Sequence, residues 1–187
     1  MAKNILALDA STKRTGYAIS KDDELITYGV ISASSQKLEK RLIVMREGVK
    51  KLIEDYNIDT IVIEEVLPDS SKPDIAFAHM NNHTTKVLTW LQGVIAVCAY
   101  EANPAINFLS IGASTWRSIL KLQGYAVKRD SQKAKDIAYV NEHFENIHLN
   151  PDQDDEADAL CILQAYINNG YSVDNKKIKT TKQEYAF

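Results

Sequence analysis

The chain has 187 residues, 45% of them hydrophobic, and a formal net charge of -3 at pH 7. This length and composition suit one domain with a full core, and the mild acidity argues against a protein that coats nucleic acid by charge alone. No run approaches the roughly 18 apolar residues of a membrane-spanning helix, and the N-terminus lacks the layout of a signal peptide. We therefore expect a cytoplasmic protein with no membrane partner.

Three short strands are predicted at the N-terminus, over residues 4–9, 15–20 and 25–33. The connections between them are short, so antiparallel pairing is the default arrangement. The first strand ends in Asp9, and aspartate is rarely buried unless it is paired or binds a metal. The sequence thus predicts a β-hairpin with an acidic side chain at its mouth.

The middle of the chain alternates helices and strands. Apolar residues recur every three or four positions over 36–56, which predicts a helix. The β-branched run over 59–66 predicts a buried central strand that carries Glu64. A long helix is expected over 75–102, and a fifth strand over 106–111.

The C-terminal part is predicted to be helical. Helices are expected over 114–122, 131–145 and 154–168. We expect one domain over residues 1–170, followed by a polar, lysine-containing tail over 171–187 that is poorly ordered.

Four carboxylates occur on these elements at positions from which they can converge. Asp9 closes the first strand, Glu64 lies in the fourth, and Asp155 and Asp158 share one face of the last helix because they are three residues apart. Two-metal phosphodiester hydrolysis needs such a set, since hard Mg²⁺ ions take oxygen ligands and a pair about 3.5–4 Å apart stabilises the attacking and leaving oxygens. Acidic residues also occur at helix N-termini because the helix dipole stabilises them there. Only the four acids taken together therefore indicate a metal site.

Four motifs in order give the sequence a family resemblance. They are ILALDASTKRTGYAI, IVIEEV, GVIAVCAY and DDEADALCI, and the match spans residues 3–168. The chain resembles RuvC-type Holliday junction resolvases of the RNase H-like superfamily, specifically their compact phage-type branch. This resemblance implies an α/β fold with a mixed five-stranded sheet, three antiparallel strands followed by two parallel ones, flanked by helices.

The same resemblance assigns roles to individual residues. It implies metal-binding and catalytic roles for four acids, Asp9, Glu64, Asp155 and Asp158. Two Mg²⁺ ions per site are implied, and Mn²⁺ is expected to substitute for them. The family has a catalytic lysine at the start of the helix that matches 131–145, and here Lys133 and Lys135 are both candidates.

A basic segment is expected to flank the acids and bind DNA phosphates. Its members are Arg117, Lys121, Lys128, Arg129, Lys133 and Lys135, against one acid, Asp130. A solvated helix face is the alternative interpretation of this segment. Leu67 falls where bacterial members carry an aromatic residue that contacts unpaired bases. We expect Leu67 to contact DNA, but an aliphatic side chain stacks poorly on bases, which argues against narrow sequence specificity.

The expected function is a metal-dependent, structure-selective DNA endonuclease. It would cut four-way junctions and also forks and flaps, inside a bacterial cell and with a phage or prophage origin. Symmetric resolution of a junction needs two active sites related by a two-fold axis, so we expect a homodimer. The helix over 75–102 has more apolar surface than one core-facing stripe requires, and it is the expected dimer contact.

Two alternatives remain open at this point. One is a catalytically silent RuvC-like module that binds or processes DNA, which should lack part of the acid set. The other is a phosphotransferase of the actin-like fold, whose hairpin also carries an aspartate, a small residue and a hydroxyl residue. Such enzymes need a second, duplicated domain, for which 187 residues leave no room.

Overall fold

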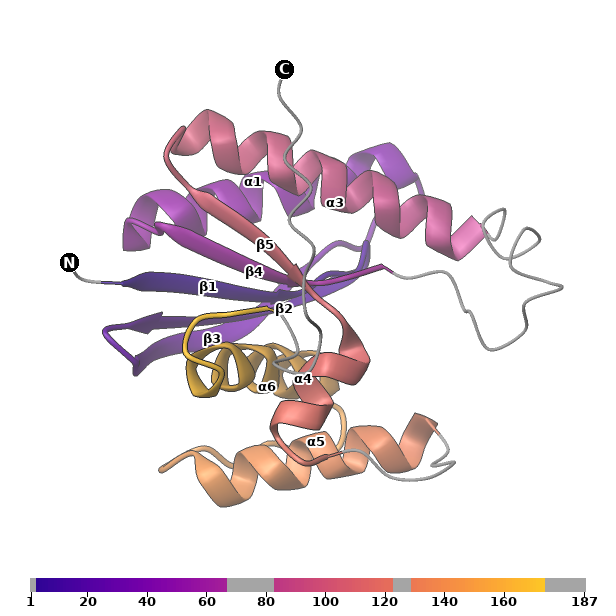
Figure 1. The fold of residues 1–187 in the computed structure, drawn as a ribbon. Helices are drawn as coiled ribbons and strands as arrows, with labels where there is room; N and C mark the ends of the chain where they lie inside the picture. The colour runs from indigo at the N-terminus through magenta and orange to yellow at the C-terminus, as the bar shows by residue number, and fades with distance from the viewer. Residues whose placement is uncertain (1–2, 67–82, 123–128, 174–187) are drawn as a thin grey trace, which may run out of the picture.

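A single mixed sheet forms the centre of the molecule. In the computed structural model, residues 3–66, 83–122 and 129–173 are described. The sheet has the order β3-β2-β1-β4-β5 (Figure 1). Its strands are β1 (Asn4–Asp9), β2 (Arg14–Lys21), β3 (Glu24–Ser32), β4 (Thr60–Glu64) and β5 (Asn107–Ile111). The first three pair antiparallel, and β4 pairs parallel with both β1 and β5, which confirms the predicted sheet.

Helices cover both faces of this sheet (Figure 1). On one face lie α1 (Leu38–Tyr56) and α3 (His83–Ala102), which pack against each other. The other face carries α4 (Ala113–Ile119), α5 (Arg129–His143) and α6 (Asp154–Asn168). Helix α6 packs directly on β1 and β2, and α5 packs on α6. The predicted helices are confirmed with small shifts at their ends, except that residues 75–82 of the long helix lie outside the described residues.

Strand alternation decides which way Asp9 points. Leu6 and Leu8 of β1 belong to the core beneath α1 and α3, whereas Ile5 and Ala7 belong to the core beneath α6. Successive side chains of a strand point to opposite faces. Asp9 therefore continues the set of Ile5 and Ala7, and it lies on the face that α6 covers.

Glu64 lies beside Asp9 for the same reason. Val62 of β4 belongs to the core beneath α6, and Ile63 belongs to the opposite core. The parallel register sets Ala7 beside Val62. Two residues further along, Asp9 and Glu64 end adjacent strands on the same face of the sheet.

The predicted C-terminal tail begins with a residue that packs against the domain. Tyr171, the first residue of the predicted tail, meets Tyr166 edge-on, and the Lys3 ammonium lies 3.0 Å from the Tyr171 ring centroid. The predicted tail from residue 174 onward lies outside the described residues. In the described part of the chain, none of the helices has the length and apolarity needed to cross a membrane.

Candidate active site

All four predicted acids line one cavity at the end of β1 and β4. The cavity has a volume of about 720 Å³. Its polar lining includes the acids Asp9, Glu64, Asp154, Asp155 and Asp158 and the side chains of Arg117, Gln132 and Lys133. Elements far apart in the sequence, a hairpin, a central strand and the last helix, thus bring the acids together.

Asp9 experiences a strongly negative environment. Its withdrawal from water raises its pKa to about 7, and the charges of Glu64 and Asp155 act in the same direction. Lys133 and Arg117 lower the pKa by a smaller amount. Crowded carboxylates of this kind repel one another, and a bound cation would relieve the repulsion.

Asp158 carries an unsatisfied oxygen. Among the described residues its buried Oδ1 has no hydrogen-bond partner, and Nη2 of Arg117 lies 3.8 Å from it. Burial raises the pKa of Asp158 to about 9, with further contributions from the charges of Asp9 and Asp136. A buried acceptor without a partner is costly unless something else binds it.

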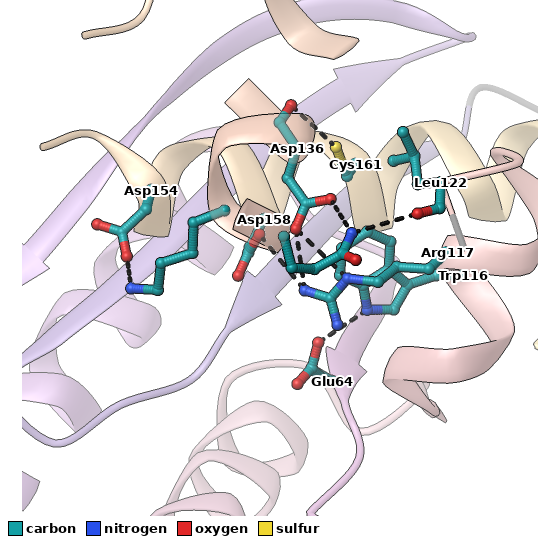
Figure 2. A network of polar contacts seen from close by, with 10 residues as sticks. Glu64, Trp116, Arg117, Leu122, Asp136, Asp154, Asp158 and Cys161 are labelled. Atoms are coloured by element: carbon teal, nitrogen blue, oxygen red, sulfur yellow. Dashed lines mark hydrogen bonds and ion pairs between the residues drawn. The ribbon is translucent and has the colours of Figure 1, made fainter. Parts of the chain in front are cut away.

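Glu64 is held in place by a tryptophan. Nε1 of Trp116 donates to Oε2 of Glu64 at 2.8 Å, as Figure 2 shows. Gln92 of α3 donates to the backbone oxygen of Glu64 at 2.6 Å. Burial raises the pKa of the Glu64 carboxyl, while the Trp116 hydrogen bond and the Arg117 charge oppose that shift. The neighbouring Glu65 is exposed and also lines the cavity.

The backbone of Asp155 packs against Gly16, and its side chain contacts Arg14. A Cβ on Gly16, which pairs with Asp9 in the hairpin, would overlap the backbone carbonyl of Asp155. The absence of a side chain at Gly16 thus lets the start of α6 approach the hairpin. The carboxylate of Asp155 accepts a hydrogen bond from Nε of Arg14 at 2.6 Å, and Arg14 also lies 3.5 Å from Glu156.

A buried network that the sequence did not predict joins α4 to α5 (Figure 2). Asp136 is 0% exposed and accepts hydrogen bonds from Arg117, with Nη2 at 3.0 Å, and from Gln132 at 3.0 Å. Arg117 therefore contacts a buried acid, although the sequence suggested a DNA phosphate. A signal for Asp136 was present, because it precedes Val140 by four residues and so lies on the buried stripe of its helix.

The two candidate lysines differ in position. Lys133 lines the cavity and forms an ion pair with Asp154, whereas Lys135 is exposed and is not part of the lining. Lys121 is likewise exposed and outside the lining. Leu67, Lys128 and the side chain of Arg129 lie outside the described residues.

The carboxylate oxygens of these acids are suitable ligands for a hard divalent cation. The acids offer only oxygen donors, and the buried Oδ1 of Asp158 accepts no hydrogen bond from the described part of the chain. Within the described residues, however, no three His, Cys, Asp or Glu side chains are arranged to hold one ion. Asp155 is engaged by Arg14 and Glu64 by Trp116, so the acids share a cavity without forming a closed coordination shell.

Solved structures identify the class of fold. Thermus thermophilus RuvC superposes with a TM-score of 0.65 at 16% identity, covering 91% of this chain and 95% of that chain. The yeast mitochondrial Holliday junction resolvase Ydc2 superposes with a TM-score of 0.54 at 16% identity, covering 89% of this chain and 78% of that chain. The fold is therefore that of the RuvC-like, RNase H-type α/β proteins.

The family follows from sequence comparison. The family model described as crossover junction endodeoxyribonuclease RuvC matches residues 5–165, so the chain belongs to the RuvC family. RuvC of Dictyoglomus thermophilum is 27% identical over 168 residues, which cover 87% of this chain and 95% of the relative. RuvC of Alkaliphilus metalliredigens is 26% identical over 180 residues, 94% of this chain and 99% of the relative. Membership makes the chain an endodeoxyribonuclease and implies dependence on a divalent metal ion.

Proposed function

We propose that this endonuclease cuts four-way DNA junctions, and also forks and flaps, by metal-dependent hydrolysis of the phosphodiester backbone. The observation that supports the proposal most is the gathering of Asp9, Glu64, Asp155 and Asp158 around one cavity in a chain of this family. A fold relative, RuvC of T. thermophilus, has been solved in complex with a Holliday junction substrate.

The proposed cofactor is Mg²⁺, with two ions per site and with Mn²⁺ able to replace them. Bound ions would supply Lewis-acid stabilisation of the attacking and leaving oxygens. The chain's own contribution is to hold the ions through the four acids and to place Lys133 against the scissile phosphate. Lys133 is preferred over Lys135 because only Lys133 lines the cavity.

The DNA-binding surface is proposed to lie along the rim of this cavity. Lys133 contacts phosphate at the site, and the exposed Lys121 and Lys135 extend the positive surface. Arg117 is better explained as the partner of Asp136. Lys128, Arg129 and Leu67 remain predicted contacts outside the described side chains.

A homodimer is proposed to form through the outer face of α3. Trp90 and Val97 of α3 are each 59% exposed. Together with Val94 of α3 and Leu42 of α1 they line a shallow apolar groove with a volume of about 600 Å³. A second copy of the chain would cover this apolar groove. The nuclease domain is proposed to be residues 1–170, acting in the cytoplasm of a bacterial cell, with a phage or prophage origin.

The alternatives are less well supported. A catalytically silent module would be expected to lack part of the acid set, but all four acids are present. Membership in the RuvC family argues against an actin-like phosphotransferase.

The direct experiment compares cleavage of four-way, forked and linear DNA of the same sequence. Each substrate is tested with Mg²⁺, with Mn²⁺ and with a chelator. We expect cleavage of the four-way and forked DNA with either ion, little cleavage of linear DNA, and none in chelator. Equal cutting of linear and four-way DNA, or unchanged cutting in chelator, would contradict the proposal.

A further inference from the structure

We infer that Trp116 and Asp136 are positioning residues of the metal site, with Trp116 orienting Glu64 and Asp136 holding Arg117 away from Asp158. The inference rests on the proposed function, because it concerns how the same acids are kept ready for a cation. Both residues are fully buried. Trp116 contacts Glu64 directly, whereas Asp136 acts on Asp158 through Arg117 (Figure 2).

Trp116 fixes one oxygen of Glu64. An indole Nε1–H can only donate, so when it is buried it needs an acceptor. Here that acceptor is Oε2 of Glu64 at 2.8 Å. A glutamate at a strand end has several rotatable bonds, and this hydrogen bond restricts them. The second carboxylate oxygen takes no part in this hydrogen bond, and Glu64 lines the cavity in which a cation would bind.

Asp136 holds the guanidinium of Arg117. Its Oδ2 accepts from Nε at 3.3 Å and from Nη2 at 3.0 Å, and its Oδ1 accepts from Gln132 at 3.0 Å. The guanidinium carbon also lies 4.0 Å from the Trp116 ring centroid, within the range of a cation–π contact. Arg117 is thus fixed between an aromatic ring and a buried acid.

The closer approach of Arg117 to Asp136 explains why Asp158 has only a long ion pair with Arg117 and no hydrogen bond from it. Nη2 lies 3.0 Å from Asp136 but 3.8 Å from Asp158, which is too far for a hydrogen bond. Among the described residues, Oδ1 of Asp158 is consequently buried without a hydrogen-bond donor. If Asp136 lost its charge, Asp158 would become the preferred partner of Arg117, and the guanidinium would compete with the metal ion for that carboxylate.

The test measures binding of Mn²⁺ alone, without DNA, from the EPR signal of the free ion. The variants are Asp136→Asn, which keeps the size of the side chain and removes its charge, and Trp116→Phe, which keeps an aromatic ring and removes the N–H. Residues that orient metal ligands typically change metal affinity by about 10- to 100-fold. We expect a loss of affinity in that range for both variants. The Mn²⁺ concentration that half-saturates junction cleavage should rise in parallel, with the rate at saturating Mn²⁺ within a few-fold of wild type.

Asp59→Asn is the matched control. Asp59 also accepts hydrogen bonds, from the Asn4 backbone N–H at 2.9 Å and from Thr60, but it precedes β4 at the end opposite Glu64. Its substitution should leave Mn²⁺ affinity unchanged. A rescue provides a second check: in the double variant Asp136→Asn/Arg117→Gln the competing cation is gone, so Mn²⁺ affinity should recover toward that of wild type.

The outcomes separate this inference from the proposed function. If wild-type protein cuts junctions with Mn²⁺ while both variants bind Mn²⁺ as wild type does, the positioning roles are wrong and the nuclease stands. An equal loss in Asp59→Asn, or no recovery in the double variant, would also reject them, since a general loss of structure would then explain the data. If wild-type protein neither binds Mn²⁺ nor cuts junctions, both proposals fail together.

Discussion

Gly16 of β2 lies directly against the backbone of Asp155 at the start of α6. The two residues are 139 positions apart by their numbers (155 minus 16), and the contact joins the hairpin that carries Asp9 to the helix that carries Asp158. A Cβ at Gly16 has no space, because it would overlap backbone atoms, which cannot rotate away as a side chain could.

Gly16→Ala should therefore displace the start of α6. Overpacking of this kind costs about 1–3 kcal/mol, and about 1 kcal/mol corresponds to roughly 2–4 °C in Tm for a chain of this length. We expect a lower Tm and a large loss of junction cleavage. Glu142→Ala is the control, since Glu142 is exposed on α5, the change adds no bulk and Tm should not fall. A Gly16→Ala protein with wild-type Tm and cleavage would show that the contact is unimportant.

The metal-free protein should lose stability as the pH rises. The folded-state pKa values of Asp9 and Asp158 are raised to about 7 and about 9, above the unfolded value of 3.8. Between the unfolded and folded pKa values the native state binds more protons than the unfolded state, so stability falls with increasing pH. We expect a lower Tm at pH 8 than at pH 5 in chelator.

Two further measurements test this explanation. Addition of Mg²⁺ at pH 8 should raise Tm, and Asp9→Asn should raise the Tm of the metal-free protein by a few degrees, since it removes a buried charge. A Tm in chelator that is higher at pH 8, or an Asp9→Asn protein that is less stable there, would contradict the crowded-acid interpretation.

Arg14 should compete with a metal ion for Asp155. The ion pair is short, but the Arg14 side chain is 48% exposed, so the pair is worth about 0–1 kcal/mol. Arg14→Gln should therefore lower the half-saturating Mn²⁺ concentration for junction cleavage by up to about fivefold. Lys51→Gln, which breaks an exposed ion pair with Asp55 on α1, is the control and should change nothing. A higher metal requirement in Arg14→Gln would mean that Arg14 supports the bound site.

A charge on the outer face of α3 should disrupt the dimer. Val97→Glu places a carboxylate in the apolar groove formed with Trp90, and it should yield a folded monomer that binds a junction but does not resolve it symmetrically. Ile26→Glu is the matched control, because Ile26 is also an exposed apolar residue but lies on β3. Sedimentation at micromolar concentration gives the oligomeric state, and a monomeric wild type would refute the proposed dimer.

The sequence predicts the position of a site residue when that position follows from local structure, and fails when it follows from packing between elements. The alternation of β1 and β4 is local, so the strand assignments already place Asp9 and Glu64 on one face once the sheet is known. The choice between Lys133 and Lys135 depends on the rotation of α5 about its axis, which is set by packing on α6 and not by spacing alone.

The pairing of Arg117 with Asp136 could not be predicted, although helical spacing already indicated that Asp136 lies on the buried side of its helix. Asp136 looks like one acid in a basic, polar segment, and only the approach of Arg117 from α4 makes its burial tolerable. Trp116 is a buried core aromatic. Its N–H orients Glu64 only because Oε2 of Glu64 lies 2.8 Å from Nε1 in the folded chain. Pairings between separate elements of this kind follow from tertiary packing.

The acids around the cavity are proposed to carry out metal-dependent cleavage of junction DNA. The most direct measurement compares wild type and Asp158→Asn for cleavage of a four-way junction in Mg²⁺ and for junction binding in chelator. We predict that Asp158→Asn cuts at least about a thousandfold more slowly, a loss of roughly 4 kcal/mol in transition-state stabilisation, while it binds the junction as tightly as wild type or more tightly. Wild-type cleavage rates in Asp158→Asn would show that the acids do not carry out the cleavage.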